Sequence, residues 1–389
     1  MESLNQKSSN IYSYSPLDRV IWDTSSILAI SNEIKRLNLN KIFIVCSSSL
    51  VKNTNEISKI KDMLGVKFVG LFDRCLEHSP IENVIECYKE VKSADPDIII
   101  TIGGGTPIDT VKVVQLCHSL NIDSKDELKK IANVFQNKLS KLRQIAIPTT
   151  LSGGEYSNMG GAMDTKQQLK ERYLGIDICP QVVILDPKIT LHTPDWLWLS
   201  TAIRSVDHAV EGFCSFSNNP LIEPMALHSL KTFAISLRGT YKDREDVESR
   251  SLSQKAVWMI AKNLGNVSMG ASHGLGYLLG SICSVPHGYT SCVMLPAVLK
   301  WNESFNLKEQ KLISKALGRP ALSASEAVSE LISDIGLPQT LNDVGVGEDQ
   351  WDKIAKYGLK HPTVLSNPKE IVSHNDIIEI LELANTKAF

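Results

Sequence analysis

A continuous apolar run that passes directly into three glycines constrains the fold more than any other part of this chain. Residues 97–102 read Asp-Ile-Ile-Ile-Thr-Ile, which is typical of a buried strand in a parallel sheet. Gly103, Gly104 and Gly105 follow at once and leave their backbone N–H groups open. Because helical residues come next, we expect these groups to lie at a helix N-terminus and to bind an anion such as a cofactor pyrophosphate.

The residues after the glycines predict where that helix begins. Thr106 is a good N-cap, Pro107 suits the first helical position, and Asp109 has capping-box spacing from Thr106. The stretch departs from G-x-G-x-x-G, because Ile108 takes the sixth position. A tight glycine turn without a ligand is therefore the alternative interpretation.

The alternation of strand and helix continues through the first half of the chain. Helical spacing is found over residues 81–93, and further strands are predicted over residues 41–46, 66–72, 144–150 and 180–187. Small hydroxyl side chains that suit contacts to ribose or phosphate stand at the end of the strand predicted over residues 144–150, at Thr149, Thr150 and Ser152. The pattern predicts a mostly parallel sheet covered by helices.

Strand signals stop after about residue 190. Helices are predicted over residues 196–216, 221–238, 251–264, 270–282, 289–304, 307–318, 322–335, 349–357 and 374–386. The fold class is therefore α/β plus all-α. We expect a parallel-sheet dinucleotide-binding domain at residues 1–187, a helical-bundle domain at residues 188–389, and an active site in the cleft between them.

Two histidines stand in an apolar, glycine-laced segment, residues 269–296. We expect this segment to bury both His273 and His287. Buried imidazoles are common metal ligands and proton shuttles, although satisfied core histidines are the plain alternative.

The predicted helix over residues 196–216 carries four polar side chains in two pairs. Arg204 shares a helix face with His208, and Asp207 shares one with Glu211, because the members of each pair are four residues apart. Histidines from separate helices could then converge as they do in metal sites inside helical bundles.

Composition limits the partners. Lys and Arg total 41 against 43 Asp and Glu, for a net charge of −2, so we expect a small-molecule substrate and neither nucleic acid nor a membrane surface. The 8 cysteines contain no C-x-x-C pair, which is typical of reduced thiols in an intracellular protein. The N-terminus lacks a signal-peptide pattern, and no apolar run is long enough to span a membrane. We expect a cytoplasmic protein, and a homodimer stays open.

Several motifs in one order make the chain resemble the iron-containing alcohol dehydrogenase superfamily, and within it the maleylacetate reductase branch. The motifs are Gly-Gly-Gly-Thr-Pro-Ile-Asp-Thr-Val-Lys at 103–112, Pro-Thr-Thr-Leu-Ser-Gly-Gly-Glu at 148–155, Asp-His-Ala-Val-Glu at 207–211, Ser-His-Gly-Leu-Gly at 272–276 and Pro-His-Gly at 286–288. The resemblance covers nearly the whole chain. It implies a dehydroquinate-synthase-like fold and NAD(P)H-dependent carbonyl reduction, or the reverse reaction.

The resemblance also implies site residues. For the cofactor they are Ser47, Gly103, Gly104, Gly105, Thr106, Asp109, Thr149, Thr150 and Ser152. Ser47 permits NADP(H), because some family members have at this place an Asp that opposes a 2′-phosphate. Metal-dependent members bind Fe or Zn through one Asp and three His, and those histidines correspond to His208, His273 and His287.

Two departures from the family pattern concern catalysis. Arg204 stands where the metal-binding Asp is implied, and Tyr277 stands where the family has a further active-site histidine. Three histidines and a water could still hold Zn²⁺, but a guanidinium repels a cation, so we expect no tightly bound metal.

Three classes of function follow. The first is a reductase of a carbonyl group in a carboxylated small molecule, in which Arg204 stabilises the developing oxyanion or pairs with a substrate carboxylate. Its proton would come from His208, His273, His287 or, less readily, Tyr277. The second class is a non-redox dehydratase, isomerase or cyclase on the same fold, and the third is a binding protein with an inactive site.

Overall fold

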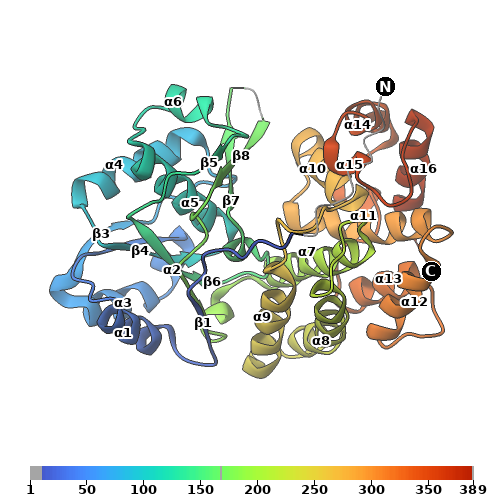
Figure 1. The fold of residues 1–389 in the computed structure, drawn as a ribbon. Helices are drawn as coiled ribbons and strands as arrows, with labels where there is room; N and C mark the ends of the chain where they lie inside the picture. The colour runs from blue at the N-terminus through green and yellow to red at the C-terminus, as the bar shows by residue number, and fades with distance from the viewer. Residues whose placement is uncertain (1–10, 167–168, 388–389) are drawn as a thin grey trace.

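A six-stranded, all-parallel sheet organises the first half of the computed structural model, which describes residues 11–166 and 169–387. In sheet order the strands are β1 (Arg19–Trp22), β9 (Val182–Leu185), β6 (Arg143–Pro148), β4 (Ile98–Gly103), β2 (Ile42–Cys46) and β3 (Phe68–Phe72). The mostly parallel, helix-covered sheet expected from the sequence is confirmed (Figure 1).

Helices cover both faces of this sheet because the central strands are apolar on both faces. Alternate residues of a strand point to opposite sides, so Ile44 packs with α1 (Ser26–Arg36) and α3 (Glu56–Leu64), whereas Val45 packs with α4 (Ile81–Ala94) and α5 (Gly105–Leu120). The short helices α2 (Ser48–Asn53) and α6 (Lys125–Lys130) complete the connections in this half.

A small second sheet lies beside α5 and was not expected from the sequence. It pairs β7 (Met159–Asp164) antiparallel with β8 (Leu169–Gly175), and β5 (Phe135–Gln136) pairs with β8. The burial of β7 alternates along the strand, and β8 carries charged residues on its exposed side. Such a half-exposed hairpin lacks the continuous apolar run that marks the buried strands.

The second half is helical, as expected. Its helices are α7 (Asp195–Cys214), α8 (Ile222–Lys242), α9 (Val247–Ala261), α10 (Ala271–Cys283), α11 (His287–Asn302), α12 (Leu307–Ala316), α13 (Ala324–Asp334), α14 (Trp351–Gly358), α15 (Pro362–Leu365) and α16 (His374–Ala384). One core surrounds α7, and a second joins α10, α11 and α16. Figure 1 shows α7 in the middle of this half, where it is covered on most sides.

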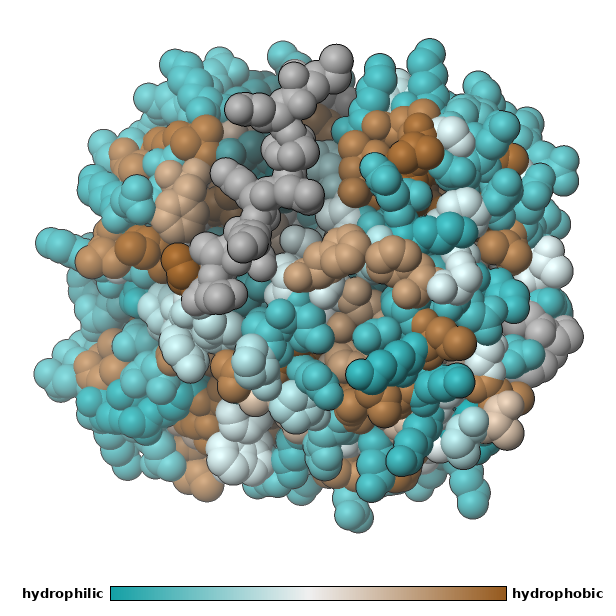
Figure 2. Space-filling view, turned by 45° about the vertical axis from the view of Figure 1, so that its right-hand side comes forward, coloured by the Kyte–Doolittle hydropathy of each residue, from teal (hydrophilic) through white to brown (hydrophobic). Residues whose placement is uncertain are grey.

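The surface gives no sign of a single large apolar patch on the face drawn in Figure 2, where hydrophobic residues are scattered among hydrophilic ones. Among the described residues, no helix combines the length and the apolar character that crossing a membrane requires.

Candidate active site

The glycine turn lies at the carboxyl edge of the sheet, although the helix after it begins earlier than the sequence predicted. Helix α5 starts at Gly105 with Gly104 as N-cap, and no side chain caps it. The prediction of Thr106 as N-cap with a capping box to Asp109 was therefore wrong. An N-cap glycine without a capping side chain leaves the first-turn N–H groups open to an anion.

Three adjacent strands, β2, β4 and β6, bring the predicted cofactor residues together. A Cβ on Gly103 would collide with Ser47 Oγ, and a Cβ on Gly104 would lie 3.0 Å from Thr150 Cγ2. A Cβ on Gly105 would lie 3.4 Å from Ser152 Oγ. The hydroxyl side chains therefore line the glycine turn at close range, and a bare backbone beside hydroxyls at a helix N-terminus fits the pyrophosphate of a dinucleotide.

The remaining cofactor candidates take different positions around this turn. Thr149 is buried, and its backbone bonds both Gly103 O, at 2.9 Å, and Thr193 Oγ1, at 2.8 Å. Thr106 and Asp109 lie in the first turns of α5, and Asp109 Oδ2 comes within 3.9 Å of Lys170 Nζ. Thr149 therefore braces the turn, whereas Asp109 faces the β7–β8 hairpin.

Sequence reasoning overlooked a buried pair below the turn, although both residues belong to quoted motifs. Lys112 is fully buried and donates to Met159 O at 2.8 Å, to Ser157 Oγ at 3.2 Å and to Gly154 O. Burial raises the pKa of the nearby Glu155 to about 7, and the attraction of Lys112 only partly offsets this. Lys112 thus ties α5 to the loop that follows Ser152.

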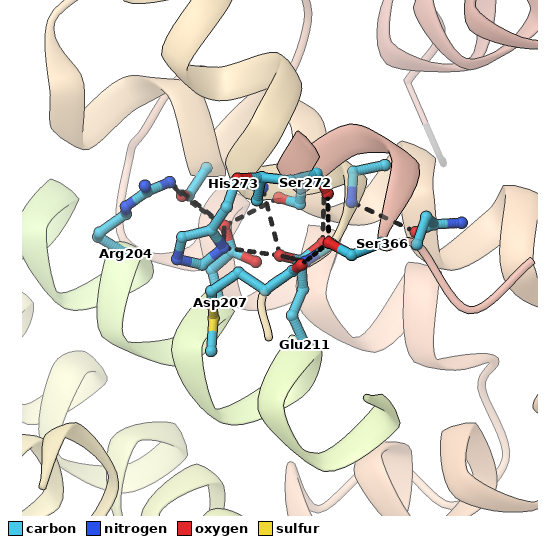
Figure 3. Close-up of polar contacts among 12 residues, drawn as sticks. Arg204, Asp207, Glu211, Ser272, His273 and Ser366 are labelled. Atoms are coloured by element: carbon cyan, nitrogen blue, oxygen red, sulfur yellow. Dashed lines mark hydrogen bonds and ion pairs between the residues drawn. The ribbon is translucent and has the colours of Figure 1, made fainter. Parts of the chain in front are cut away.

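Helix α7 supplies the polar side chains of the helical half. Arg204 is 3% exposed, and the side chains of Asp207, His208 and Glu211 are also buried. Figure 3 shows Arg204, Asp207 and Glu211 on α7 directed toward His273 of α10. The helical spacing of the sequence predicted these shared faces, but not the depth at which they lie.

Asp207 is the centre of this network. Its Oδ2 accepts hydrogen bonds from Ser291 Oγ at 2.6 Å and Ser272 Oγ at 2.8 Å, and it lies 3.6 Å from Arg204 Nη1. Arg204 Nη1 also donates to Ser291 Oγ at 3.0 Å. Desolvation opposes ionisation of Asp207, but the positive charges of His273 and Arg204 outweigh it and lower the pKa. Arg204 is therefore a buried guanidinium with a fixed counter-ion.

Glu211 holds both the N-terminus of α10 and the ring of His273. Its carboxylate accepts from the backbone N–H of Gly270 at 2.8 Å and of Ser272 at 2.7 Å, and it contacts His273 Nδ1 at 2.7 Å. Burial and the charge of Arg204 lower the pKa of His273, but the adjacent Asp207 and Glu211 carboxylates outweigh them and raise it to about 9. The two carboxylates thereby compensate the positive charges of Arg204 and His273.

His208 stacks against His273 with ring centroids 4.8 Å apart. Desolvation, His273 and Arg204 together lower the pKa of His208 well below its ordinary value. Among the described residues, three buried atoms of this corner have no hydrogen-bond partner: Asp207 Oδ1, His208 Nδ1 and His273 Nε2. Unpaired polar atoms at such depth are typical of a site that a ligand or water completes.

The expectation that the glycine-rich segment buries both of its histidines was half right. His273 is 1% exposed, but His287 is the first residue of α11 and is exposed to solvent. Tyr277 is 39% exposed and stacks on His287 at 6.0 Å, and the Arg204 guanidinium lies 5.2 Å from the centre of its ring. Burial raises the pKa of Tyr277, but the positive charges of Arg204, His273 and Lys170 together outweigh it, so the net shift is downward.

The donor set does not suit a divalent metal. Within the described residues, the set of three ligand atoms that lie within 4.8 Å of one another comprises Asp207, Glu211 and His273, and it does not include His208 or His287. Asp207 Oδ2 and His273 Nδ1 already take part in protein hydrogen bonds, and a guanidinium stands 3.6 Å from Asp207 Oδ2. A fixed positive charge at this distance opposes a bound cation.

Two family models match the chain. The model of the C-terminal region of the Fe-containing alcohol dehydrogenase family matches residues 199–385, and the iron-containing alcohol dehydrogenase model matches residues 18–187. Together they cover the strand-rich and the helical halves.

Individual relatives agree with these matches. Dehydrogenase FUM7 of Gibberella moniliformis is 29% identical over 92% of this chain and 93% of its own length. A maleylacetate reductase of Pseudomonas sp. (strain P51) is 25% identical over 92% of each chain. The crystal structure of sulfoacetaldehyde reductase from Bifidobacterium kashiwanohense in complex with NAD+ superposes with a TM-score of 0.86, at 21% identity, over 97% of this chain and 99% of that chain. At this identity the last similarity shows the fold.

Proposed function

The chain belongs to the iron-containing alcohol dehydrogenase family and is an oxidoreductase of that type, and we propose that it uses NAD(P)H to reduce the carbonyl group of a small carboxylated metabolite without a tightly bound metal. The observation that carries this proposal is Arg204, a buried guanidinium at the place where the resemblance implies a metal-binding carboxylate. In this proposal residues 1–187 bind the cofactor and residues 188–389 carry the catalytic side chains.

The cofactor, when bound, supplies the hydride. The open N–H groups of α5 hold its pyrophosphate, with the hydroxyls of Ser47, Thr150 and Ser152 beside the glycine turn. Thr149 and Lys112 keep this turn and the next loop in place through hydrogen bonds to backbone and side-chain oxygens. These residues bind and orient, and they take no part in the bond changes.

The oxygen of the substrate carbonyl becomes an alkoxide, which requires positive charge and a proton. Arg204 supplies the charge from behind Tyr277, because its own side chain is 3% exposed while Tyr277 is 39% exposed. The most direct donor is therefore the Tyr277 phenol, whose O–H bond breaks as the new O–H bond forms on the substrate. His273 is 1% exposed and is paired with both Asp207 and Glu211, so it holds these carboxylates in place.

The proposal that the substrate is carboxylated rests on two points. A reductase of maleylacetate, which is an anionic carbonyl compound, is among the relatives. The Arg204 guanidinium also lies 5.2 Å from the centre of the Tyr277 ring, and Lys170 acts on the ionisation of Tyr277 as well. An anionic substrate gains from these charges, whereas a neutral aldehyde gains little.

The test is oxidation of NADH and NADPH by a panel of oxo acids, their esters and simple aldehydes, together with metal analysis of the purified protein. We expect turnover with at least one oxo acid, metal far below one ion per chain, and no loss of activity after dialysis against a chelator. One tightly held ion per chain with chelator-sensitive activity would refute the metal-free mechanism. No oxidation of either cofactor across the panel would refute the reductase proposal.

A further inference from the structure

Two basic side chains of the strand-rich half act electrostatically on the exposed part of the helical site. His78 and Lys170 lie before α4 and on β8, whereas Tyr277 and His287 lie on α10 and α11, and all four are exposed to solvent. Lys170 acts electrostatically on His78, Tyr277 and His287, and His78 acts on His287. The β7–β8 hairpin lies on the side of its half that is turned toward α10 (Figure 1). The four side chains therefore lie within electrostatic reach of one another where the two halves face each other, and each is exposed to solvent.

The position of Lys170 depends on a glycine on the neighbouring strand. A Cβ on Gly161 of β7 would collide with Lys170 Cε, so the absence of a side chain at Gly161 lets the lysine lie across β7. Its Nζ stops 3.9 Å from Asp109 Oδ2, and the two side chains are 44% and 20% exposed. A pair this long and this exposed is weak, so the ammonium is available to a ligand.

His78 is presented by a constrained loop. His78 and Ser79 both have left-handed backbone conformations, with φ of 60° and 51°, which costs free energy in residues other than glycine. Ser79 fixes the loop by donating to Thr106 O at 3.2 Å and by accepting from Met163 N–H at 3.0 Å through its carbonyl. The loop is thus anchored both to the first turn of α5 and to β7, and strain of this kind is concentrated at functional sites.

Arg204 does not offer its charge to a substrate carboxylate directly. It is 3% exposed and is paired with Asp207 and Ser291. Among the described residues that act on the ionisation of Tyr277, Lys170 is the one whose positive charge is exposed to solvent. The loop of His78 lies near Lys170, because Met163 of β7 pairs with both Pro80 and Lys170.

We propose that Lys170 and His78 bind the carboxylate, or a comparable oxyanion, that the substrate carries away from its reacting carbonyl group. This inference rests on the proposed reductase function and deepens it, because it assigns substrate specificity to the strand-rich half and transition-state charge to Arg204. Binding is by charge and hydrogen bonding alone, with no covalent step.

The test compares acids with their neutral methyl esters, using pyruvate and methyl pyruvate, and 4-oxobutanoate and methyl 4-oxobutanoate, with NADPH and NADH as reductants. Lys170→Met keeps the stem and removes the charge, Gly161→Ala displaces the lysine without removing it, and His78→Asn keeps a residue that tolerates a left-handed backbone. The matched control is Lys92→Met, since Lys92 is 45% exposed, pairs with Asp123 at 3.4 Å and lies in the last turn of α4, at the opposite end of that helix from His78.

We expect Lys170→Met to raise the KM for an acid about 10- to 100-fold, the loss for one hydrogen bond to a charged group, and to leave the KM for its ester and the Kd for NAD(P)H unchanged. Gly161→Ala and His78→Asn should also raise the KM for the acid, and Lys92→Met should leave it unchanged.

Equal losses for acid and ester, or weaker binding of the cofactor, would place Lys170 in the cofactor site and overturn the inference. Unchanged acid kinetics in all three variants would overturn it while the reductase function stands. No oxidation of NADPH or NADH by the parent with any oxo acid, ester or aldehyde of the panel would remove the reductase function and this inference with it.

Discussion

The two sides of the site hold their groups in opposite ways. The cofactor edge, made of Ser47, Gly103, Gly104, Gly105, Thr150 and Ser152, uses bare backbone and small hydroxyls and carries no formal charge. The charged corner, made of Arg204, Asp207, Glu211 and His273, buries four ionisable side chains that compensate one another. An uncharged edge can lose one contact and keep its shape, whereas removal of one member of the corner leaves another charge unpaired in the interior.

The sharpest test of this difference is Asp207→Asn, which keeps the shape of the side chain and removes the charge. Arg204 then lies buried without its counter-ion, so the free energy of unfolding should fall by about 3–5 kcal/mol in urea titrations. The control is Asp334→Asn, because Asp334 pairs with Arg238 at 2.7 Å but is 38% exposed, and about 1 kcal/mol or less should be lost. Equal losses in the two variants would mean that the corner does not depend on charge compensation.

Arg204→Ala tests the corner through turnover. Loss of the guanidinium behind Tyr277 should lower kcat by about 100-fold or more with little change in the Kd for NAD(P)H, as for removal of an oxyanion donor. The control Arg238→Ala removes an arginine that is also paired with an aspartate but is partly exposed to solvent, and it should leave kcat unchanged. Parent-like turnover in Arg204→Ala would make Arg204 purely structural.

The same position can also be used to restore a metal site. Arg204→Asp alone would place a third carboxylate beside Asp207 and Glu211, and the three negative charges would repel one another. The double variant Arg204→Asp with Asp207→Asn avoids this repulsion and should bind Zn²⁺ or Fe²⁺ more tightly than the parent does. Metal titration of the double variant measures this, and failure to bind would show that the rest of the corner excludes metal as well.

Glu155 shows the cost of a buried carboxylate whose charge the strand-rich half compensates only in part, through Lys112. Burial raises its pKa from the ordinary 4.5 to about 7, so the unfolded chain loses this proton first and stability should fall as the pH rises from about 4.5 to about 7. The fall should be about 3 kcal/mol, as for a pKa raised from 4.5 to about 7, and Glu155→Gln should remove it. Unfolding at a series of pH values measures the slope, with the exposed Glu379→Gln as control. Identical slopes in the parent and in Glu155→Gln would refute this assignment.

The smallest effect is expected at the cofactor edge itself. In Gly104→Ala the new Cβ lies 3.0 Å from Thr150 Cγ2, so Thr150 must move by a few tenths of an ångström. The Kd for NAD(P)H should rise about tenfold, corresponding to roughly 1.4 kcal/mol, while stability stays close to that of the parent. Gly280→Ala, where the nearest atom is 3.8 Å away, should leave the Kd unchanged in the same fluorescence titration. If Gly104→Ala lowered the free energy of unfolding by several kcal/mol, the edge and the corner would not differ in their tolerance of substitution.

The sequence by itself determined the fold class, the parallel sheet and the meeting of the glycine turn with small hydroxyl side chains at one edge of that sheet. The runs at residues 97–102 and 144–150 are locally apolar, and Gly103 to Gly105 and Ser47 follow strand ends that a parallel sheet must bring to one edge. Patterns of this kind involve only residues that are neighbours in the sequence, so they can be recognised without the tertiary structure. The motifs that contain them also identified the family.

The sequence did not determine the β7–β8 hairpin, the first residue of α5 or the exposure of His287. The hairpin lacks a buried apolar run, α5 starts on a glycine in place of the better-capping Thr106, and His287 is the first residue of a helix. In each case packing overrode the local preference.

Only the tertiary structure decided which charged groups of the site lie close together and how deeply they are buried. Arg204 could equally have been a surface residue, and its burial beside Asp207 depends on Ser291, which lies 84 residues from Asp207 along the chain. Lys170 likewise acts on the ionisation of Tyr277 only because the two halves face each other. The free energy of a buried charge depends on the distance and desolvation of its neighbours in space, and sequence spacing fixes neither once the neighbours come from different elements.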